Sequence, residues 1–434
     1  MDWKEVYNER LCSANEAVRK IHSGDRVSLG HAVGEPTYII DAMMDNYKSY
    51  ENIEITHMLP MGESPYAKPG MEKHFKHNSL FVGGATRGTI MEGHGDVTPC
   101  YFSQIPYLWE RTMPLDVAIM QVSPPDEHGY VSLGVSVDYS KEAAIRAKTV
   151  IAQVNKYMPR TLGDSFLHCS QIDCIVEHDA PIIELAPPTI TDVERAIGEY
   201  CASLVQDGDC LQLGIGAIPD AISLFLKDKK DLGIHSEMFS DSVVTLVEEG
   251  VITNQAKNFH KGKMLATFLM GTKRLYDFVD NNPMVEMHPA SYTNDPFIAG
   301  KNDNLVAINS CVQVDLLGQV CSETVGTTQI SAVGGQVDFV RAAALSKGGR
   351  SIIAMPSTTA KGSISKIVAT LDEGAVVTTN RYDVEYVVTE YGIANLKYQR
   401  VRDRARMLIG IAHPDFRPQL IDAFEKRFQA PYKR

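Results

Sequence analysis

The chain has 434 residues and a formal net charge of −12, with 44% hydrophobic and 22% charged residues. This length suits two domains, and the composition is that of a globular protein with a large core. The acidic balance argues against a nucleic-acid-binding protein, which normally carries a basic excess. An anionic small substrate remains compatible with it, because one lysine and a few backbone N–H groups can bind such a molecule locally.

Neither the cysteines nor the N-terminus indicates an oxidising or membrane setting. The eight cysteines show no CxxC spacing, so we expect buried free thiols and no metal site. The opening MDWKEVYNERLCSANEAV lacks the apolar stretch of a secretion signal, and no apolar run is long enough to span a bilayer. We therefore expect a cytoplasmic protein without membrane or nucleic-acid partners.

One pattern occurs twice in the chain. Residues 24–36 read GDRVSLGHAVGEP, and residues 208–219 read GDCLQLGIGAIP. Each copy combines Gly-Asp, a short strand, a small-residue loop and a proline, and each lies between amphipathic helical patterns. This repetition predicts two similarly folded halves. The proline-rich stretch HDAPIIELAPPTITDVE is the natural boundary, which gives domains 1–186 and 187–434.

Short apolar runs between helical patterns predict further strands in both halves. These runs cover residues 52–59, 115–123, 149–155, 171–177, 264–271, 304–315, 351–356, 375–380 and 385–392. The alternation of strands and helices predicts α/β folds with open, mostly parallel sheets. Because such sheets bind ligands beyond the carboxyl ends of their strands, the loops after the strands are the candidate functional segments.

In the first half, three loops follow predicted strands and carry HAVGEP, THMLPMGES and VGGATRGTIMEGHG. We expect this half to provide the carboxylic-acid side of a substrate pocket. His31, His57 and Arg87 are possible ligands for a substrate carboxylate or hydroxyl. A structural role explains each of them at least as well, so none is assigned to the site.

LQLGIGAIPDAI in the second half reads as a strand, a glycine loop and a helix start. Glycines allow backbone N–H groups to approach a phosphate or a thioester oxygen closely. The alternative is a tight strand–helix turn without a ligand. A nicotinamide or flavin enzyme is disfavoured, because Gly214 and Gly216 lack the third glycine of a dinucleotide fingerprint.

GIHSEMFSD places Glu237 among apolar neighbours at the end of a short predicted strand. A carboxylate there suits a nucleophile or a general base that faces the glycine loop. The alternative is a glutamate paired with a lysine or an arginine. A metal site built on His235 and Glu237 lacks a third ligand nearby.

Three further loops in the second half hold polar groups that such chemistry uses. HPASYTNDP contains Asn294, whose amide can donate to an oxyanion; SAVGGQVDFVRAA offers the N–H groups of Gly334 and Gly335. MPSTTAKGSISKIV contains Lys361, whose ammonium can reach a phosphate or a carboxylate. Turn formation or solvation explains each residue taken alone, but together with Glu237 they form a consistent set.

The chain resembles the acetyl-CoA hydrolase/transferase group of family I CoA-transferases, and within it the 4-hydroxybutyrate type. The resemblance covers essentially the whole chain and rests on ordered motifs. These are SPPDEHGYVSLGVSVDY, GIGAIPDAI, GIHSEMFSD, SAVGGQVDFVR, VVTEYGIA and the terminal IAHPDF.

The resemblance implies two open α/β domains with the active site in the cleft between them. It implies that Glu237 is the nucleophile and forms a glutamyl-CoA thioester, and that Asn294 and Gly335 donate to the oxyanion. It also implies the residues that hold CoA. These are Gly214, Ile215, Gly216, Ala217, Ile218, Gly335, Lys361 and backbone near Val312.

The implied reaction moves CoA from acetyl-CoA or butyryl-CoA to a short-chain carboxylic acid, with 4-hydroxybutyrate preferred, by a ping-pong mechanism. CoA thioesters would be substrates, with no permanently bound cofactor and no metal. Butyryl-CoA:acetate exchange and acyl-CoA hydrolysis by the same glutamate remain alternatives, and a non-catalytic CoA-binding protein is a third. We expect a homodimer, the commonest symmetric assembly.

Overall fold

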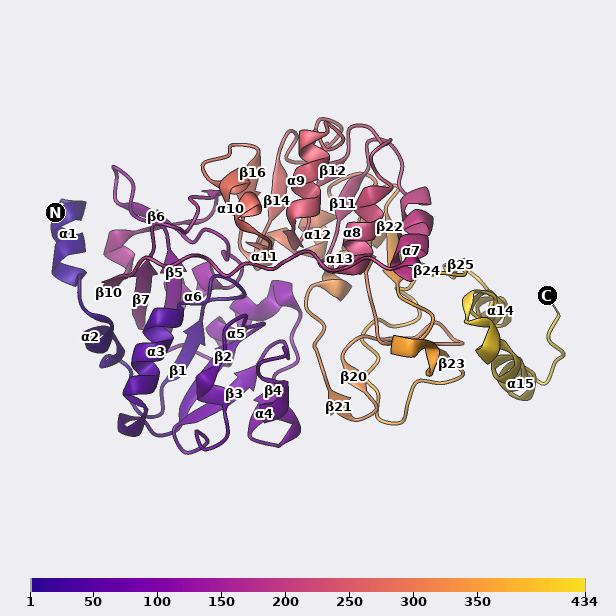
Figure 1. Cartoon of the computed structure of the whole chain (residues 1–434), viewed down its shortest axis with the longest axis horizontal. Coiled ribbons are helices and arrows are strands. Elements are labelled where there is room, and N and C mark those ends of the chain that lie inside the picture. The colour runs from indigo at the N-terminus through magenta and orange to yellow at the C-terminus, as the bar shows by residue number, and fades with distance from the viewer. Residues whose placement is uncertain (1, 434) are drawn as a thin grey trace. The chain divides into compact units, whose positions relative to one another are not determined.

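A seven-stranded sheet forms the centre of the first of two compact units in the computed structural model, which describes residues 2–433 (Figure 1). All neighbouring strands in this sheet run parallel. Their order across the sheet is β10 (Cys174–Glu177), β7 (Thr149–Val154), β5 (Val117–Val122), β1 (Arg26–Leu29), β2 (Ile53–His57), β3 (Phe75–Ser79) and β4 (Gly95–Val97).

Helices cover this sheet because its strands carry apolar residues on both faces. In α2 (Ala14–Val18) and α3 (Thr37–Asp45), the buried side chains join those of β1, β2 and β5 in one core cluster. The helices α5 (Ile105–Arg111) and α6 (Ser140–Arg146) pack together, and α6 contacts β1 and β5. Near-continuous burial along β5 is the pattern expected of a parallel strand covered on both sides.

The second unit has a six-stranded sheet with the same kind of topology. Its strand order is β12 (Gly233–Ile234), β11 (Cys210–Gln212), β17 (Leu305–Asn309), β22 (Arg350–Ala354), β24 (Tyr386–Thr389) and β25 (Gly392–Asn395). All neighbours are parallel except β24 and β25, which form an antiparallel hairpin.

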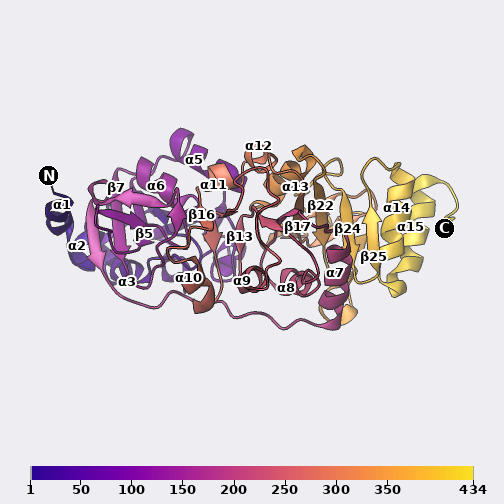
Figure 2. The same ribbon diagram turned by 90° about the horizontal axis from the view of Figure 1, so that it is seen from above.

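Helices flank this sheet as well. The helix α7 (Asp192–Ser203) packs on α8 (Ala217–Leu224) and contacts β22 and β24, while α13 (Gln336–Leu345) contacts β17 and β22. At the β25 edge, α14 (Val401–Ile411) and α15 (Arg417–Phe428) lie beside the sheet and share a core cluster with it (Figure 2).

Smaller sheets and short helices complete the two units. Unit 1 also contains β6 (Tyr130–Ser132), β8 (Leu162–Gly163), β9 (Phe166–His168), β14 (Met264–Ala266), β15 (Phe268–Leu269), β16 (Val285–Met287), α1 (Trp3–Arg10), α4 (Arg87–Met91), α10 (Lys273–Val279) and α11 (Ala290–Thr293). Unit 2 also contains β13 (Met238–Phe239), β18 (Gln313–Asp315), β19 (Val320–Cys321), β20 (Thr324–Val325), β21 (Thr328–Gln329), β23 (Ile367–Val368), α9 (Asp241–Glu248) and α12 (Pro296–Ala299).

The unit boundaries differ from the predicted domains in one segment. Unit 1 comprises residues 1–186 and 263–294, whereas unit 2 comprises residues 187–262 and 295–434. The returning segment belongs to unit 1 because its strands β14 and β16 continue onto β8 in a three-stranded parallel sheet. The compact units thus differ from the predicted contiguous second domain at residues 263–294, whose apolar runs look in the sequence like the strands around them.

Four other expectations can be compared with the structure. The fold class is confirmed, since both units contain open, mostly parallel α/β sheets. The run 304–315 forms two strands in different sheets, and residues 375–380 form none, because only Thr379 makes an isolated bridge to Val320.

All eight cysteines lie within the described residues and are free thiols. Within residues 2–433, no helix has both the length and the hydropathy needed to span a bilayer.

A buried ion pair holds the second sheet across β17. Arg350 Nη2 lies 2.6 Å from Asp209 Oδ2, and the two side chains are 14% and 2% exposed. Replacing Arg350 by methionine leaves the carboxylate buried without its cation, so we expect the free energy of unfolding to fall by about 3–5 kcal/mol in urea titrations. In the double variant Asp209→Asn/Arg350→Met most of this loss should be recovered.

Lys227→Met is the matched control for this measurement. Lys227 pairs with Glu249 at 2.7 Å, but both side chains are largely exposed. Such pairs contribute about 0–1 kcal/mol. An equal loss of stability in the Arg350 and Lys227 variants would show that burial does not decide the value of the pair.

Candidate functional site

Four loops of unit 2 meet at the carboxyl edge of its sheet. Glu237 follows β12, the segment Gly214–Ile218 follows β11, Val312 follows β17 and Lys361 follows β22. Because β12, β11, β17 and β22 are parallel neighbours, their carboxyl ends lie at one edge. The structure therefore gathers these residues, which are far apart in the sequence, along one side of one sheet.

The order of the strands places a topological switch point between two of these loops. The chain runs from β11 to β12 on one side and later returns to β17 on the other side of β11. Ligands of open α/β sheets bind at such a switch point. Here it lies between the Gly214–Ile218 segment and the loop that holds Val312. At this end, the Asn309 amide donates to Gln212 Oε1 at 3.1 Å and joins the two strands.

Glu237 is held beside the start of the glycine loop by its two neighbours. The Leu213 N–H donates to the Ser236 hydroxyl at 3.2 Å, and that hydroxyl lies 2.9 Å from the Leu213 carbonyl oxygen. Met238 forms an antiparallel bridge with Leu213. Since Gly214 follows Leu213 directly, these contacts fix the backbone of Glu237 against the loop. The carboxylate residue itself is half-buried, between the buried side chains of Ser236 and Met238.

His235 connects this segment to α13. The amide of Asn302 lies 3.0 Å from His235 Nδ1, and the buried imidazole packs edge-on against Phe339 with a centroid distance of 6.3 Å. The Phe339 N–H in turn donates to the carbonyl of Gly335 at 3.0 Å. His235 therefore supports the packing between the Glu237 segment and the first turn of α13.

Gly335 caps α13 at the same edge of the sheet. At the opposite end of this helix, the Ser346 hydroxyl accepts from the Leu305 N–H at 3.0 Å, and Leu305 begins β17. Because α13 thus ends at the amino edge of the sheet, Gly335 lies at its carboxyl edge. Gly334 precedes it with φ 53°, a conformation that glycine adopts readily.

The predicted glycine loop is shorter than expected. The helix α8 begins at Ala217, so Ala217 and Ile218 form its first turn, and Gly216 is the N-cap with φ 112°. The N–H groups of a first helical turn have no partner within the helix and carry the positive end of its dipole. The segment thus joins an exposed loop residue, Ile215, to a helix N-terminus.

A small sheet joins the segments that follow Val312 and Lys361. Val314 in β18 pairs with Ile367 in β23, so the two segments run side by side at that point. Lys361 is exposed and has φ 68°. The Val312 N–H donates to the Cys321 carbonyl at 2.8 Å, so it is occupied within unit 2, and the expected CoA contact of the backbone near Val312 stays a prediction.

Asn294 differs most from its predicted setting. It was expected in a polar loop of the second half, but it belongs to the last residues of unit 1 and is completely buried. It ends the short helix α11, where its N–H donates to the Ala290 carbonyl at 3.0 Å. Its part in the site stays a prediction.

The two candidate histidines of unit 1, His31 and His57, make hydrogen bonds within the fold. His31 Nδ1 lies 3.2 Å from Asp138 Oδ2, and His57 lies 2.6 Å from the Tyr66 hydroxyl through Nε2. All four side chains are buried. These contacts agree with the structural reading of both histidines and with leaving them out of the assigned site.

Glu35 is a buried acid that the sequence did not single out. It follows β1, whose neighbours β2 and β5 mark the switch point of the first sheet, and it is 3% exposed. Burial raises the pKa of Glu35 to about 7, although N–H groups of Gly62 and Met61 oppose the shift. The Gly62 N–H donates to Glu35 Oε2 at 2.7 Å. The sequence did offer one signal for Glu35. In the first copy of the repeat, GEP lies in the loop that corresponds to the glycine loop of the second copy.

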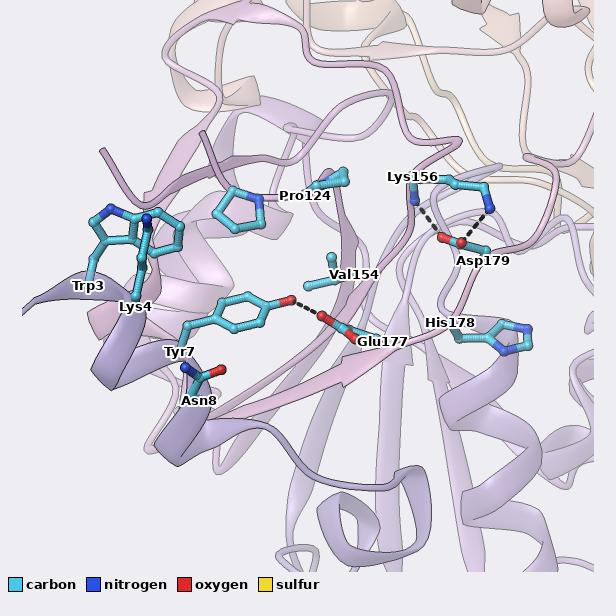
Figure 3. Close-up of a pocket in the computed structure, with 11 residues that line it drawn as sticks. Trp3, Lys4, Tyr7, Asn8, Pro124, Val154, Lys156, Glu177, His178 and Asp179 are labelled. Carbon is cyan, nitrogen blue, oxygen red and sulfur yellow. Dashed lines mark hydrogen bonds and ion pairs between the residues drawn. The ribbon is translucent and has the colours of Figure 1, made fainter. Parts of the chain in front are cut away.

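A separate cleft of about 590 Å³ lies in unit 1, where β5, β7 and β10 end against α1. Figure 3 shows Tyr7 directed at Glu177 and Lys156 at Asp179. The Tyr7 hydroxyl donates to Glu177 at 2.8 Å, and Lys156 pairs with Asp179 at 2.7 Å. None of the predicted site residues lines this cleft, so it does not serve as the reaction centre proposed below.

Known proteins share both the sequence and the fold of this chain. The family described as acetyl-CoA hydrolase/transferase matches with its N-terminal domain over residues 1–187 and its C-terminal domain over residues 271–424. The chain belongs to this family. The sequence is 60% identical to a 4-hydroxybutyrate coenzyme A transferase of Clostridium kluyveri, covering 99% of this chain and 100% of that protein.

Two solved structures are similar over almost their whole length. A 4-hydroxybutyrate CoA-transferase from Porphyromonas gingivalis is 44% identical with a TM-score of 0.86, covering 98% of this chain and 100% of the other. RipA from Yersinia pestis is 39% identical with a TM-score of 0.94, covering 99% and 100% respectively. The likeness therefore spans both units of this CoA-transferase-like fold.

The glycine loop can be tested with a pair of alanine variants. No heavy atom lies within 4 Å of a Cβ built on Gly214 or Gly216, so neither variant is crowded, but only Gly216 has a φ that alanine rarely adopts. We expect Gly216→Ala to lower the free energy of unfolding by about 1–3 kcal/mol. Gly214→Ala should stay within about 0.5 kcal/mol of the parent. If both substitutions changed the free energy of unfolding equally, the positive φ of Gly216 would not explain the effect.

The buried Glu35 predicts a pH dependence of stability. Its pKa is higher in the folded than in the unfolded state, so the folded state binds the proton more tightly. This contribution is fully present below about pH 4.5 and is lost by about pH 7.5, a decline of about 3 kcal/mol. Urea titrations should show that the wild type loses this stability relative to Glu35→Gln over that interval. A constant difference between the two proteins would contradict the prediction.

Proposed function

We propose that the protein is a CoA-transferase that moves CoA from a short acyl-CoA, such as acetyl-CoA or butyryl-CoA, to 4-hydroxybutyrate. Family membership and the two similar 4-hydroxybutyrate transferases support this choice of acid. A butyryl-CoA:acetate CoA-transferase of Anaerostipes caccae is 40% identical over 98% of the chain, which supports butyryl-CoA as donor. The observation that carries the proposal is the attachment of the Glu237 segment to Leu213, at the start of the glycine loop.

Glu237 acts as the nucleophile in this proposal. Its carboxylate attacks the thioester carbonyl of the donor, the C–S bond breaks, and a mixed anhydride and CoA thiolate form. The thiolate then attacks the Glu237 carbonyl carbon and releases the donor acid as a carboxylate, which leaves a glutamyl-CoA thioester. The acceptor carboxylate repeats the steps in reverse and takes CoA away. One thioester replaces another, and the covalent intermediate produces ping-pong kinetics.

Oxyanion stabilisation is assigned to the Gly335 N–H and the Asn294 amide. Each attack creates a tetrahedral oxyanion, and a fixed donor aimed at such an oxygen is typically worth about 2.7–4 kcal/mol. The position of Gly335 at the carboxyl edge, one helical turn from the residue that packs on His235, supports its part. The assignment of Asn294 rests on the resemblance alone.

CoA is assigned to the switch point of the second sheet. The Gly214–Ile218 segment brings a helix N-terminus, which favours phosphate or thioester oxygens. Lys361 adds a cation on the loop after β22 at the same edge, and the exposed position of its side chain suits a phosphate group. Binding the long CoA body far from the sulfur helps to align the reacting atoms.

The decisive experiment is to trap the intermediate. We expect that incubation with butyryl-CoA without an acceptor acid, followed by borohydride reduction and peptide mass spectrometry, converts Glu237 to the corresponding alcohol. Without butyryl-CoA the residue should remain a carboxylate. Glu237→Gln should lose at least about 10³-fold in kcat, since an amide is a poor nucleophile.

Glu249→Gln is the control, because Glu249 is an exposed partner of Lys227 in the same unit and should keep full activity. If butyryl-CoA is consumed without modification of Glu237, the protein is a hydrolase in which the glutamate acts as a general base. If nothing is consumed, the proposed transferase activity is wrong.

A further inference from the structure

The loop that carries Lys361 is closed at its base by a carboxylate from the next strand. The Ser357 N–H donates to Glu390 Oε2 at 2.8 Å, and the Ser357 hydroxyl donates to Oε1 at 2.6 Å. Ser357 is completely buried. Both oxygens of one carboxylate therefore bind one residue, in hydrogen bonds that the charge strengthens.

Glu390 reaches this loop from a hairpin tip. Thr389 and Gly392 pair in the antiparallel β24–β25 hairpin, so Glu390 and Tyr391 form its two-residue turn. Met355 is also tied to β24, because its N–H donates to the Val388 carbonyl at 3.0 Å. The hairpin thus supplies the last fixed contacts before the chain enters the Lys361 loop.

Beyond Ser357 the loop is held mainly by its own backbone. The Lys366 N–H donates to the Ser357 carbonyl at 2.8 Å, and the Thr359 N–H donates to the Ile364 carbonyl at 2.9 Å. Lys361 lies at the tip with φ 68°, and residues 361–364 are exposed. The position of the tip therefore depends on how firmly Ser357 is anchored.

We infer that Glu390 is a positioning residue that fixes the Lys361 loop for binding the nucleotide phosphates of CoA. This inference rests on the proposed function, which assigns Lys361 to CoA. Glu390 needs no contact with substrate in this role. It acts through Ser357 and lowers the cost of ordering the loop when CoA binds, as preorganisation does in general.

Glu390→Gln tests the inference because it keeps the size of the side chain. The amide oxygen can still accept from the Ser357 N–H, and the amide NH2 can donate to the Ser357 hydroxyl, so the substitution removes the negative charge that strengthens both bonds and reverses one of them. We expect the KM for butyryl-CoA to rise about 10-fold with kcat changed less than about twofold. Turnover of butyryl-pantetheine, which lacks the nucleotide, should stay unchanged. In a Lys361→Ala background, Glu390→Gln should add no further increase in KM.

Glu385→Gln is a matched control at the other end of the same strands. Glu385 precedes β24 and accepts from the Ser351 N–H at 3.2 Å, near the start of β22 and away from the Lys361 loop. This variant also replaces a carboxylate that binds a serine N–H. It should leave the KM for butyryl-CoA at the wild-type value.

A second measurement needs no enzymatic activity. Trypsin cleaves after Lys361 when the loop opens, and such cleavage follows the population of the open form. We expect faster cleavage at Lys361 in Glu390→Gln and an unchanged rate in Glu385→Gln. This assay tests the contact between Glu390 and Ser357 even if Glu237 proves not to be the nucleophile.

Two results would overturn the inference. The first is a wild-type cleavage rate together with a wild-type KM in Glu390→Gln, which would show that the carboxylate does not order the loop. The second is an equal loss with butyryl-CoA and butyryl-pantetheine, which would show that Glu390 only stabilises the hairpin.

Discussion

Parallel pairing of the strands is the constraint on which the candidate site depends. Parallel neighbours must all end at the same edge of a sheet. Loops that are about 150 residues apart in the sequence, such as those of Gly214 and Lys361, therefore lie at one edge with only the loop after β17 between them. The short strand β12 adds Glu237 to this edge through β11. The Glu237 segment, a helix N-terminus and Lys361 therefore share one side of unit 2 as a consequence of topology.

The repeated motif is where the sequence was most informative. The strands of its two copies, β1 and β11, occupy equivalent places in their sheets. β1 lies between β2 and β5, and β11 lies between β12 and β17. Both copies therefore lie at a switch point, which is why their loops matter. Alternation of strands with helices predicted the fold class for the same reason, because period and turn chemistry are local properties that the sequence displays.

What the sequence could not predict depends on contacts between distant residues. Nothing local marks residues 263–294 as part of unit 1, since their strands are apolar like those around them and only the pairing of β16 with β8 decides it. The occupied N–H of Val312 follows from its pairing with Cys321, and the pKa of Glu35 follows from burial. Pairing and burial are tertiary outcomes that override local preference.

At the carboxyl edges of both sheets, the backbone hydrogen bonds between strands end where the loops begin. Their backbone groups need other partners, and buried or half-buried side chains provide them. Glu35 accepts from Gly62 in the loop after the neighbouring strand, Ser236 binds Leu213, and Glu390 binds Ser357. In each case one side chain ties adjacent loops at a carboxyl edge. Rigid placement of flexible segments by a few such ties lets reactive groups be exposed and still be ordered.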